Sequence, residues 1–430
     1  MTSPLPAQPA WFGQPRGLTV LFLTNMWEQF SYYGMRALLV YYMTKELLFG
    51  QQQASLIYGI YTAGAYFTPI LGGAIADRYL GKRRAIVIGG SVMAAGHFMM
   101  TFPPLFYPAL ATIALGNGLF LPSLPSQIDD LYEPGDQRVG WAYNVYYVGV
   151  NIGGFLAPLA CGTVGEMYGW HWGFGLAGVG MCLGLGFYLW GQRYLPAQAR
   201  PARVEGISPR GRFDRRTVLL LVAIAASVTV FRGAYEQLGN TVALWADSGV
   251  DKQAGGWAIP MSWFIALNPL FVMLMTPPLL RYWRGRAEAG RPEAPARRMA
   301  TGALIVAGAY LLLVALSAMS GAARTAWPWF VLFFAIITFG ELFILPTGLG
   351  LFARLAPRGL GATTVAAWFL ATFSGSLFGG VIGTLWSAMS HPAYFALLAL
   401  LAVVAAAMLR LSDTLEQQVQ HDRERDAEAA

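Results

Sequence analysis

A few ionisable side chains lie inside long apolar stretches of this 430-residue sequence. They are Glu28, Arg36, His97, Arg232, Glu236 and Glu341. A charge is costly to bury, so each is expected to face a cavity, an ion partner or the interface with water. The glutamates could titrate and the arginines could neutralise them, whereas His97, close to the end of its stretch, is better explained by packing.

The spacing of these residues suggests which of them can pair. Arg232 and Glu236 stand at positions i and i+4, which places them on one face of a helix and within reach of each other. Arg36 lies about two helical turns beyond Glu28, too far along the helix to neutralise it. Arg36 could instead reach a carboxylate on another helix, and we predict that this carboxylate is Glu236.

The helices that carry these residues must cross a membrane. Hydrophobic residues make up 56% of the chain and charged residues 12%, about half the charged share of a soluble domain. A helix needs roughly 20 apolar residues to cross the bilayer core. The sequence therefore predicts an all-α membrane protein with twelve transmembrane helices, at residues 18–46, 53–76, 85–104, 107–130, 139–163, 171–195, 216–246, 257–283, 299–320, 327–355, 360–388 and 391–411.

Basic residues indicate how these helices are oriented and divided. Lys and Arg are concentrated after every second predicted helix, for example in residues 78–84 and 281–298. The positive-inside rule then places these loops and both termini in the cytoplasm, and we expect a multi-pass protein of the bacterial inner membrane. The predicted domains are an N-terminal six-helix bundle (1–195), a cytoplasmic linker (196–215), a C-terminal six-helix bundle (216–411) and a solvated cytoplasmic tail (412–430).

The composition and motifs argue against several other classes of protein. The net charge of +7 comes mostly from loops between apolar stretches, so we expect the lipid bilayer, and not nucleic acid, as a partner. Cys161 and Cys182 both lie in apolar stretches, and we predict no disulfide framework, no metal site and no cofactor. The sequence contains no phosphate-cradling loop, nucleophile elbow or zinc-protease motif, which argues against an enzyme.

Tyrosines and tryptophans are frequent within the predicted helices. A buried tyrosine hydroxyl needs a hydrogen-bond partner, so some of these side chains are expected to face a polar cavity and others to lie at the membrane interfaces. The loop after the second predicted helix carries Asp77, Arg78 and Gly81, an acid and a base at a tight turn. This loop resembles the signature loop of the major facilitator superfamily.

Motifs within the helices resemble a narrower family, the proton-dependent oligopeptide transporters. The resemblance covers nearly the whole chain and rests on residues 30–36 (FSYYGMR), 66–69 (YFTP), 76–81 (ADRYLG), 147–153 (YVGVNIG), 169–174 (GWHWGF), 236–237 (EQ), 268–269 (NP) and 340–342 (GEL). It implies a major facilitator fold of two six-helix bundles that imports di- and tripeptides by alternating access, driven by protons.

Matching positions in the family imply roles for individual residues. The peptide cavity would be lined by Tyr32, Tyr33, Tyr66, Asn151, Tyr235, Asn268, Glu341 and Trp368. Glu341 would bind the amino group of the peptide, because a carboxylate complements an ammonium. Arg36 and Glu236 would form the gate between the bundles on the periplasmic side, with Glu28 and Arg232 as further gate or coupling residues.

The sequence departs from the family pattern in three respects. The first helix usually reads E-x-x-E-R, but residues 25–29 read NMWEQ, and Leu121 stands where a lysine usually precedes Pro122. Those cations would balance the acids and bind the peptide carboxylate. Glu28 has neither, so burial should favour its protonated form. The third departure is Arg232, where the family usually has an aromatic residue.

These departures leave several functions open. The first is import of di- and tripeptides or peptide-like solutes, coupled to protons by an atypical route or, alternatively, running as an uncoupled facilitator or exchanger. The second is transport of a non-peptide solute, with Arg232 as a replacement cation. The third is a membrane receptor that binds without transporting. We expect a monomer, and the sequence leaves the solute, the stoichiometry and the conformational state undefined.

Overall fold

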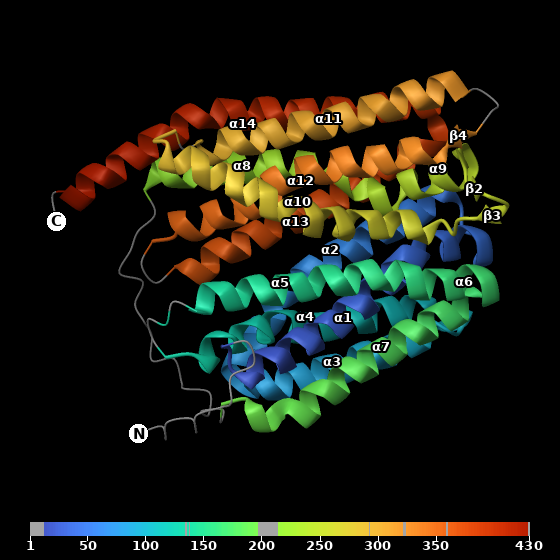
Figure 1. Ribbon diagram of the computed structural model, residues 1–430, viewed down its shortest axis with the longest axis horizontal. Helices are drawn as coiled ribbons and strands as arrows, with labels where there is room; N and C mark the ends of the chain where they lie inside the picture. The colour runs from blue at the N-terminus through green and yellow to red at the C-terminus, as the bar shows by residue number, and fades with distance from the viewer. Residues whose placement is uncertain are drawn as a thin grey trace. The chain divides into compact units, whose positions relative to one another are not determined.

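The computed structural model describes residues 13–133, 136, 138–196, 214–291, 293–320, 324–357 and 360–428. These residues are almost entirely helical (Figure 1). Most of the predicted linker, residues 197–213, lies outside the described residues. The chain divides into two compact units, Met1–Leu48 with Gly64–Glu205 and Phe49–Ala63 with Gly206–Ala430, called the N-terminal unit and the C-terminal unit below.

The N-terminal unit is a bundle of long helices. Its helices are α1 (Arg16–Tyr41), the second half of α2 (Gln51–Ile75), α3 (Lys82–Met99), α4 (Phe106–Ser123), α5 (Arg138–Ala157), α6 (Thr163–Tyr168) and α7 (Trp170–Gly191). Single π-helical turns extend α1 (Tyr42–Glu46) and α2 (Ala76–Leu80), and another, Pro158–Gly162, joins α5 to α6. Helix α1 packs against α5 and α7, and α3 packs against α4 and α7, around an apolar core (Figure 1).

The C-terminal unit contains the first half of α2, the remaining helices and two very short sheets. Its own helices are α8 (Arg215–Tyr235), α9 (Thr241–Gly249), α10 (Ser262–Glu288), α11 (Pro295–Ser320), α12 (Trp327–Leu355), α13 (Gly361–Thr384) and α14 (His391–Glu428), and a 3₁₀ turn, Glu236–Gly239, separates α8 from α9. Strand β1 (Val250–Asp251) pairs in parallel with β4 (Thr325–Ala326), and β2 (Gln253–Ala254) pairs antiparallel with β3 (Trp257–Ala258).

The turn between β2 and β3 changes one predicted boundary. Gly255 and Gly256 have φ values of +60° and +86°, a conformation that glycine adopts without strain and that suits a two-residue hairpin. The hairpin occupies the start of the span predicted at residues 257–283, and α10 therefore begins only at Ser262.

The helices are those of a multi-pass membrane protein, as the composition predicted. Nine helical stretches of the described residues are long and apolar enough to cross a membrane. Helices α1, α2 and α3, at the positions of the first three predicted spans, are further long helices outside that set. The all-α class is confirmed, and the positions of the helices fit a count of twelve spans.

The tail beyond residue 411 is more ordered than a solvated extension would be. Helix α14 continues to Glu428, and it buries Ser412, Asp413, Glu416 and Val419. The Glu416 carboxylate accepts a hydrogen bond of 2.9 Å from the backbone N–H of Ala296, in the first turn of α11, which lies beside α14 (Figure 1). A carboxylate is favourable there, because the first N–H groups of a helix have no partner within it.

Replacing Glu416 by alanine should destabilise the C-terminal unit. The change leaves the buried Ala296 amide without its acceptor, at a cost of roughly 1–3 kcal/mol, and should lower the apparent Tm of the detergent-solubilised protein. Gln418→Ala, at an exposed position of the same helix, is the matched control and should leave Tm nearly unchanged. Equal Tm values for the two variants would show that the contact between α14 and α11 contributes no stability.

Candidate functional site

Three of the residues predicted to bind a solute meet in the C-terminal unit. The amide nitrogen of Asn268, on α10, lies 2.7 Å from Oε2 of Glu341 and 3.0 Å from the hydroxyl of Thr338, both on α12, and 3.3 Å from the hydroxyl of Tyr235 on α8. Asn268 and Glu341 are half-buried. A carboxylate held by an amide donor keeps oxygen lone pairs for a further donor, so this cluster could bind a cationic group such as an ammonium.

Trp368, the remaining predicted binding residue of this unit, packs between helices. Its ring stands edge-on to Phe352 at a centroid distance of 5.4 Å and fills the space beside Gly348, which has no side chain. Trp368 is only 6% exposed. This environment supports a role in packing α13 against α12, and its role in binding stays a prediction.

Arg232 and Glu236 form the ion pair that their spacing suggested. Nη2 of Arg232 donates to Oε1 of Glu236, and only 5% and 2% of the two side chains are exposed. The same carboxylate oxygen accepts a 3.2 Å hydrogen bond from the hydroxyl of Ser376 on α13. Arg36, the predicted partner of Glu236, belongs to the N-terminal unit, and that pairing stays a prediction.

Glu28 lies in the interior of the N-terminal unit with amides around it. It is 1% exposed, and Nε2 of Gln29 donates to its Oε2 at 2.7 Å, whereas Oε1 has no hydrogen-bond partner among the described residues. Asn25, one turn earlier on α1, donates to the carbonyl of Tyr146. At one of the departures from the family motif, Gln29, a neutral amide therefore donates to this carboxylate, whereas the amide at the other, Asn25, is bonded to a backbone carbonyl.

The other predicted binding residues of the N-terminal unit lie on three helices. Tyr32 and Tyr33, on α1, are half-buried with their rings at right angles, 5.4 Å apart. Tyr66 is half-buried on α2. The amide of Asn151 donates to the carbonyl of Tyr147 one turn earlier on α5, so this donor is engaged within its own helix.

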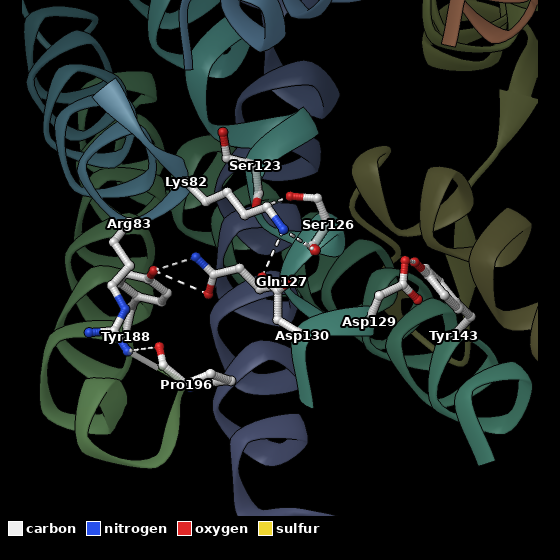
Figure 2. Close-up of polar contacts among 10 residues, drawn as sticks. All are labelled: Lys82, Arg83, Ser123, Ser126, Gln127, Asp129, Asp130, Tyr143, Tyr188 and Pro196. Carbon is white, nitrogen blue, oxygen red and sulfur yellow. Dashed lines mark hydrogen bonds and ion pairs between the residues drawn. The ribbon is translucent and has the colours of Figure 1, made fainter. Parts of the chain in front are cut away.

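The predicted signature loop is a π-helical turn that ends in a glycine. Asp77 and Arg78 are exposed, and Gly81 has φ +77°, which lets the chain reverse into α3. The first residues of α3 make the contacts that the sequence did not predict. Lys82 donates to the carbonyl of Ser126 and pairs with Asp130 at 2.7 Å, as Figure 2 shows.

Arg83 makes a second set of contacts from the same turn. Its guanidinium donates to the carbonyl of Leu195 at 2.8 Å, beyond the end of α7. It also donates to the carbonyl of Pro196 at 2.5 Å, as Figure 2 shows. Lys82 and Arg83 therefore tie the start of α3 to the ends of α4 and α7. The sequence signal for Lys82 and Arg83 was the basic run after Gly81. From the sequence, this run indicates only the orientation of the helices in the membrane.

Neutral polar contacts join the first half of α2 to the other helices of the C-terminal unit. Nε2 of Gln51 donates to the carbonyl of Gly383 at 2.8 Å, and the hydroxyl of Ser55 lies 3.0 Å from Oδ1 of Asn240. We call this set of residues, together with Gly59 and Gly380, the α2 clasp. A Cβ atom on Gly380 would lie 2.9 Å from Cα of Gly59, so the two backbones touch at these glycines.

The polar clusters inside long apolar helices define a multi-pass membrane transporter. A sequence model of the POT family matches residues 83–205 and 209–397. The chain belongs to this family of transporters, and the resemblance stated from its motifs is confirmed.

Individual relatives and structures agree with this assignment. The chain is 30% identical to the uncharacterized transporter YclF of Bacillus subtilis (strain 168), over 94% of each protein. It is also 30% identical to a di-/tripeptide transporter of Lactococcus lactis subsp. cremoris, over 93% of this chain and 95% of the relative. A crystal structure of a POT peptide transporter in complex with sulfate superimposes with a TM-score of 0.86 at 29% identity, over 95% of this chain and 97% of that one. The fold is therefore the major facilitator fold, and these relatives are transporters, not enzymes.

Cysteines introduced at Ser55 and Gly383 should form a disulfide on mild oxidation, in a chain whose Cys161 and Cys182 are replaced by alanine. A Cβ atom on Gly383 lies 2.9 Å from Cβ of Ser55, and a disulfide needs about 3.8 Å, so a small shift suffices. Protection of both thiols from a maleimide reagent after denaturation measures the cross-link. Ser55→Cys with Val381→Cys, exposed on the same helix, is the control, and equal cross-linking of the two pairs would contradict the α2 clasp.

Proposed function

We propose that this protein is a secondary active transporter that imports di- and tripeptides or peptide-like solutes across the bacterial inner membrane, with both termini in the cytoplasm. Membership of the POT family and the names of its relatives support peptides as the solute. The contact between Asn268 and Glu341 is the observation that carries the proposal, because it presents a carboxylate inside the transporter.

Glu341 is suited to bind the amino group of a peptide. The Asn268 amide orients the carboxylate, and the hydroxyl of Tyr235 stands next to the same amide as an additional polar group. A peptide ammonium would satisfy the carboxylate charge without water, which compensates for the dehydration of both groups. Tyr32, Tyr33, Tyr66 and Asn151 would supply contacts to the rest of the solute from the N-terminal unit.

Cationic side chains that could bind the C-terminal carboxylate of a peptide are fewer than is usual in the family. Leu121 and Gln29 occupy positions where the family usually has cations, and Arg232 is already paired with Glu236. This observation favours a second candidate, a peptide-like solute that has an amino group but whose other end is not a carboxylate. Inhibition of uptake by peptides with amidated C-termini would separate this candidate from a transporter of free peptides.

Glu341→Gln should weaken the recognition of the solute amino group. In proteoliposomes, the wild type should take up dialanine and ignore N-acetyl-dialanine as a competitor, because the acetyl group removes the charge. The variant should raise KM for dialanine by at least tenfold, which corresponds to about 1.4 kcal/mol, and should discriminate less between the two. Glu46→Gln, an exposed acid, is the control. Undiminished discrimination in Glu341→Gln would rule out this role.

Glu28→Gln should uncouple transport from protons. Burial away from water disfavours the charged form of a carboxylate, so Glu28, which is 1% exposed, is a candidate to carry a proton across. We expect wild-type uptake to rise when the outside is made acidic, and the variant to exchange solute across the membrane without responding to the gradient. A wild type that ignores the gradient would rule out proton symport, and a variant that still responds would remove Glu28 as the essential carrier.

A further inference from the structure

We propose that Arg232 is a built-in counter-ion that keeps Glu236 ionised throughout the transport cycle, so that Glu236 carries no proton. The inference rests on the proposed function, because it concerns the residue predicted to form a gate with Arg36. Its consequence for the mechanism is specific: release of Arg36 from Glu236 needs no protonation of the carboxylate.

The pair is contained within one segment of the chain. Arg232 lies in the last turn of α8 and Glu236 begins the 3₁₀ turn that follows without interruption, so their backbones are fixed one turn apart. Both belong to the C-terminal unit. A movement of one unit against the other therefore leaves their separation unchanged, whereas a contact between Arg36 and Glu236 is one that alternating access would have to break.

Helix α13 closes over the pair with small residues. A Cβ atom on Gly375 would lie 2.6 Å from Cβ of Arg232, and one on Gly379 would lie 3.0 Å from Cβ of Glu236. The α13 backbone thus packs directly on the two side chains and excludes bulk water from them. Ser376, between the two glycines, adds a hydroxyl donor to the Glu236 carboxylate. No residue of α13 is ionisable.

The other titratable groups around the pair do not replace Arg232. Tyr310 of α11 donates to the carbonyl of Ala234 at 2.6 Å, and Tyr394 of α14 donates to Gln237 at 3.0 Å, and both phenols are neutral at neutral pH. Glu341 of α12 is held by Asn268 and has the same sign of charge as Glu236. Among the described residues of the C-terminal unit, Arg232 is therefore a cation that forms an ion pair with Glu236.

A proton on Glu236 would remove the negative charge that is paired with the buried guanidinium of Arg232. Arginine cannot give up its own proton in a protein, so the cost could not be avoided by neutralising both groups. Breaking a buried pair by removing one charge is strongly unfavourable. A solute carboxylate at Arg232 would have to compete with the Glu236 carboxylate that is already paired there.

The pH dependence of thermal stability tests this inference without any solute. We would compare the wild type, Arg232→Gln, Arg232→Lys and the neutral double variant Arg232→Gln/Glu236→Gln from pH 5 to pH 8. If Glu236 does not titrate, the wild type, Arg232→Lys and the double variant should show parallel curves of Tm against pH. In Arg232→Gln, the buried carboxylate favours the protonated form in the folded state, so its stability should fall as the pH rises, by at least about 3 °C relative to the double variant.

Two results would overturn the inference. One is that the curves of Tm against pH are parallel for Arg232→Gln and the double variant, and the other is that the difference in Tm between the wild type and the double variant changes with pH. If Arg232→Gln alone fails to fold, the comparison of the wild type with the double variant keeps the test possible. Where peptide uptake is measurable, the double variant should keep the wild-type number of protons moved per peptide, and a lower number would also overturn the inference. Failure of peptide uptake would count against the proposed function and leave the stability test valid.

Discussion

The interior of a lipid bilayer provides no hydrogen bonds, and the polar side chains inside these helices are placed accordingly. Gln29 donates to Glu28, Asn268 donates to Glu341, and Arg232 donates to Glu236. In each case the partner comes from the same helix or from an adjacent one in the same unit. The helices must therefore hold each donor next to its acceptor. This requirement explains where helices pack closely and where a helix is interrupted.

The break between α8 and α9 illustrates the requirement. A 3₁₀ turn frees backbone carbonyls at the end of α8, and the fully buried amide of Gln237 donates to the carbonyl of Gly233 there at 2.9 Å. The same amide donates to the carbonyl of Gly379 on the neighbouring α13 at 2.8 Å. Its oxygen in turn accepts hydrogen bonds from the hydroxyls of Thr241 and Tyr394. The Gln237 side chain thus stabilises the break between α8 and α9. Glu236 of the ion pair lies at the start of this break, and Asn240 of the α2 clasp follows its end.

Local patterns in the sequence predicted the helices and the ion pair at i, i+4, and the resemblance to the family implied the polar residues that α8, α10 and α12 bring together. They did not predict the contacts of Lys82 with Asp130, of Glu416 with Ala296 or of Gln51 with Gly383. Those contacts join residues that are far apart in the chain, and they depend on packing, which hydropathy does not encode. The hairpin turn at residues 255–256 is different, because its two consecutive glycines were a local signal that could have been used.

The chemistry of these contacts restricts where a proton could act. The α2 clasp consists of amides, a hydroxyl and glycines, so its formation does not depend on the charge of any titratable group. On our proposal, the pair of Arg232 and Glu236 is likewise indifferent to pH in the working range. Glu341 is suited to a solute ammonium, and a carboxylate that accepts a proton loses the charge that binds this ammonium. In the proposed mechanism, coupling at Glu341 would therefore be competition between proton and solute, whereas the buried Glu28 would hold a proton while the solute is bound.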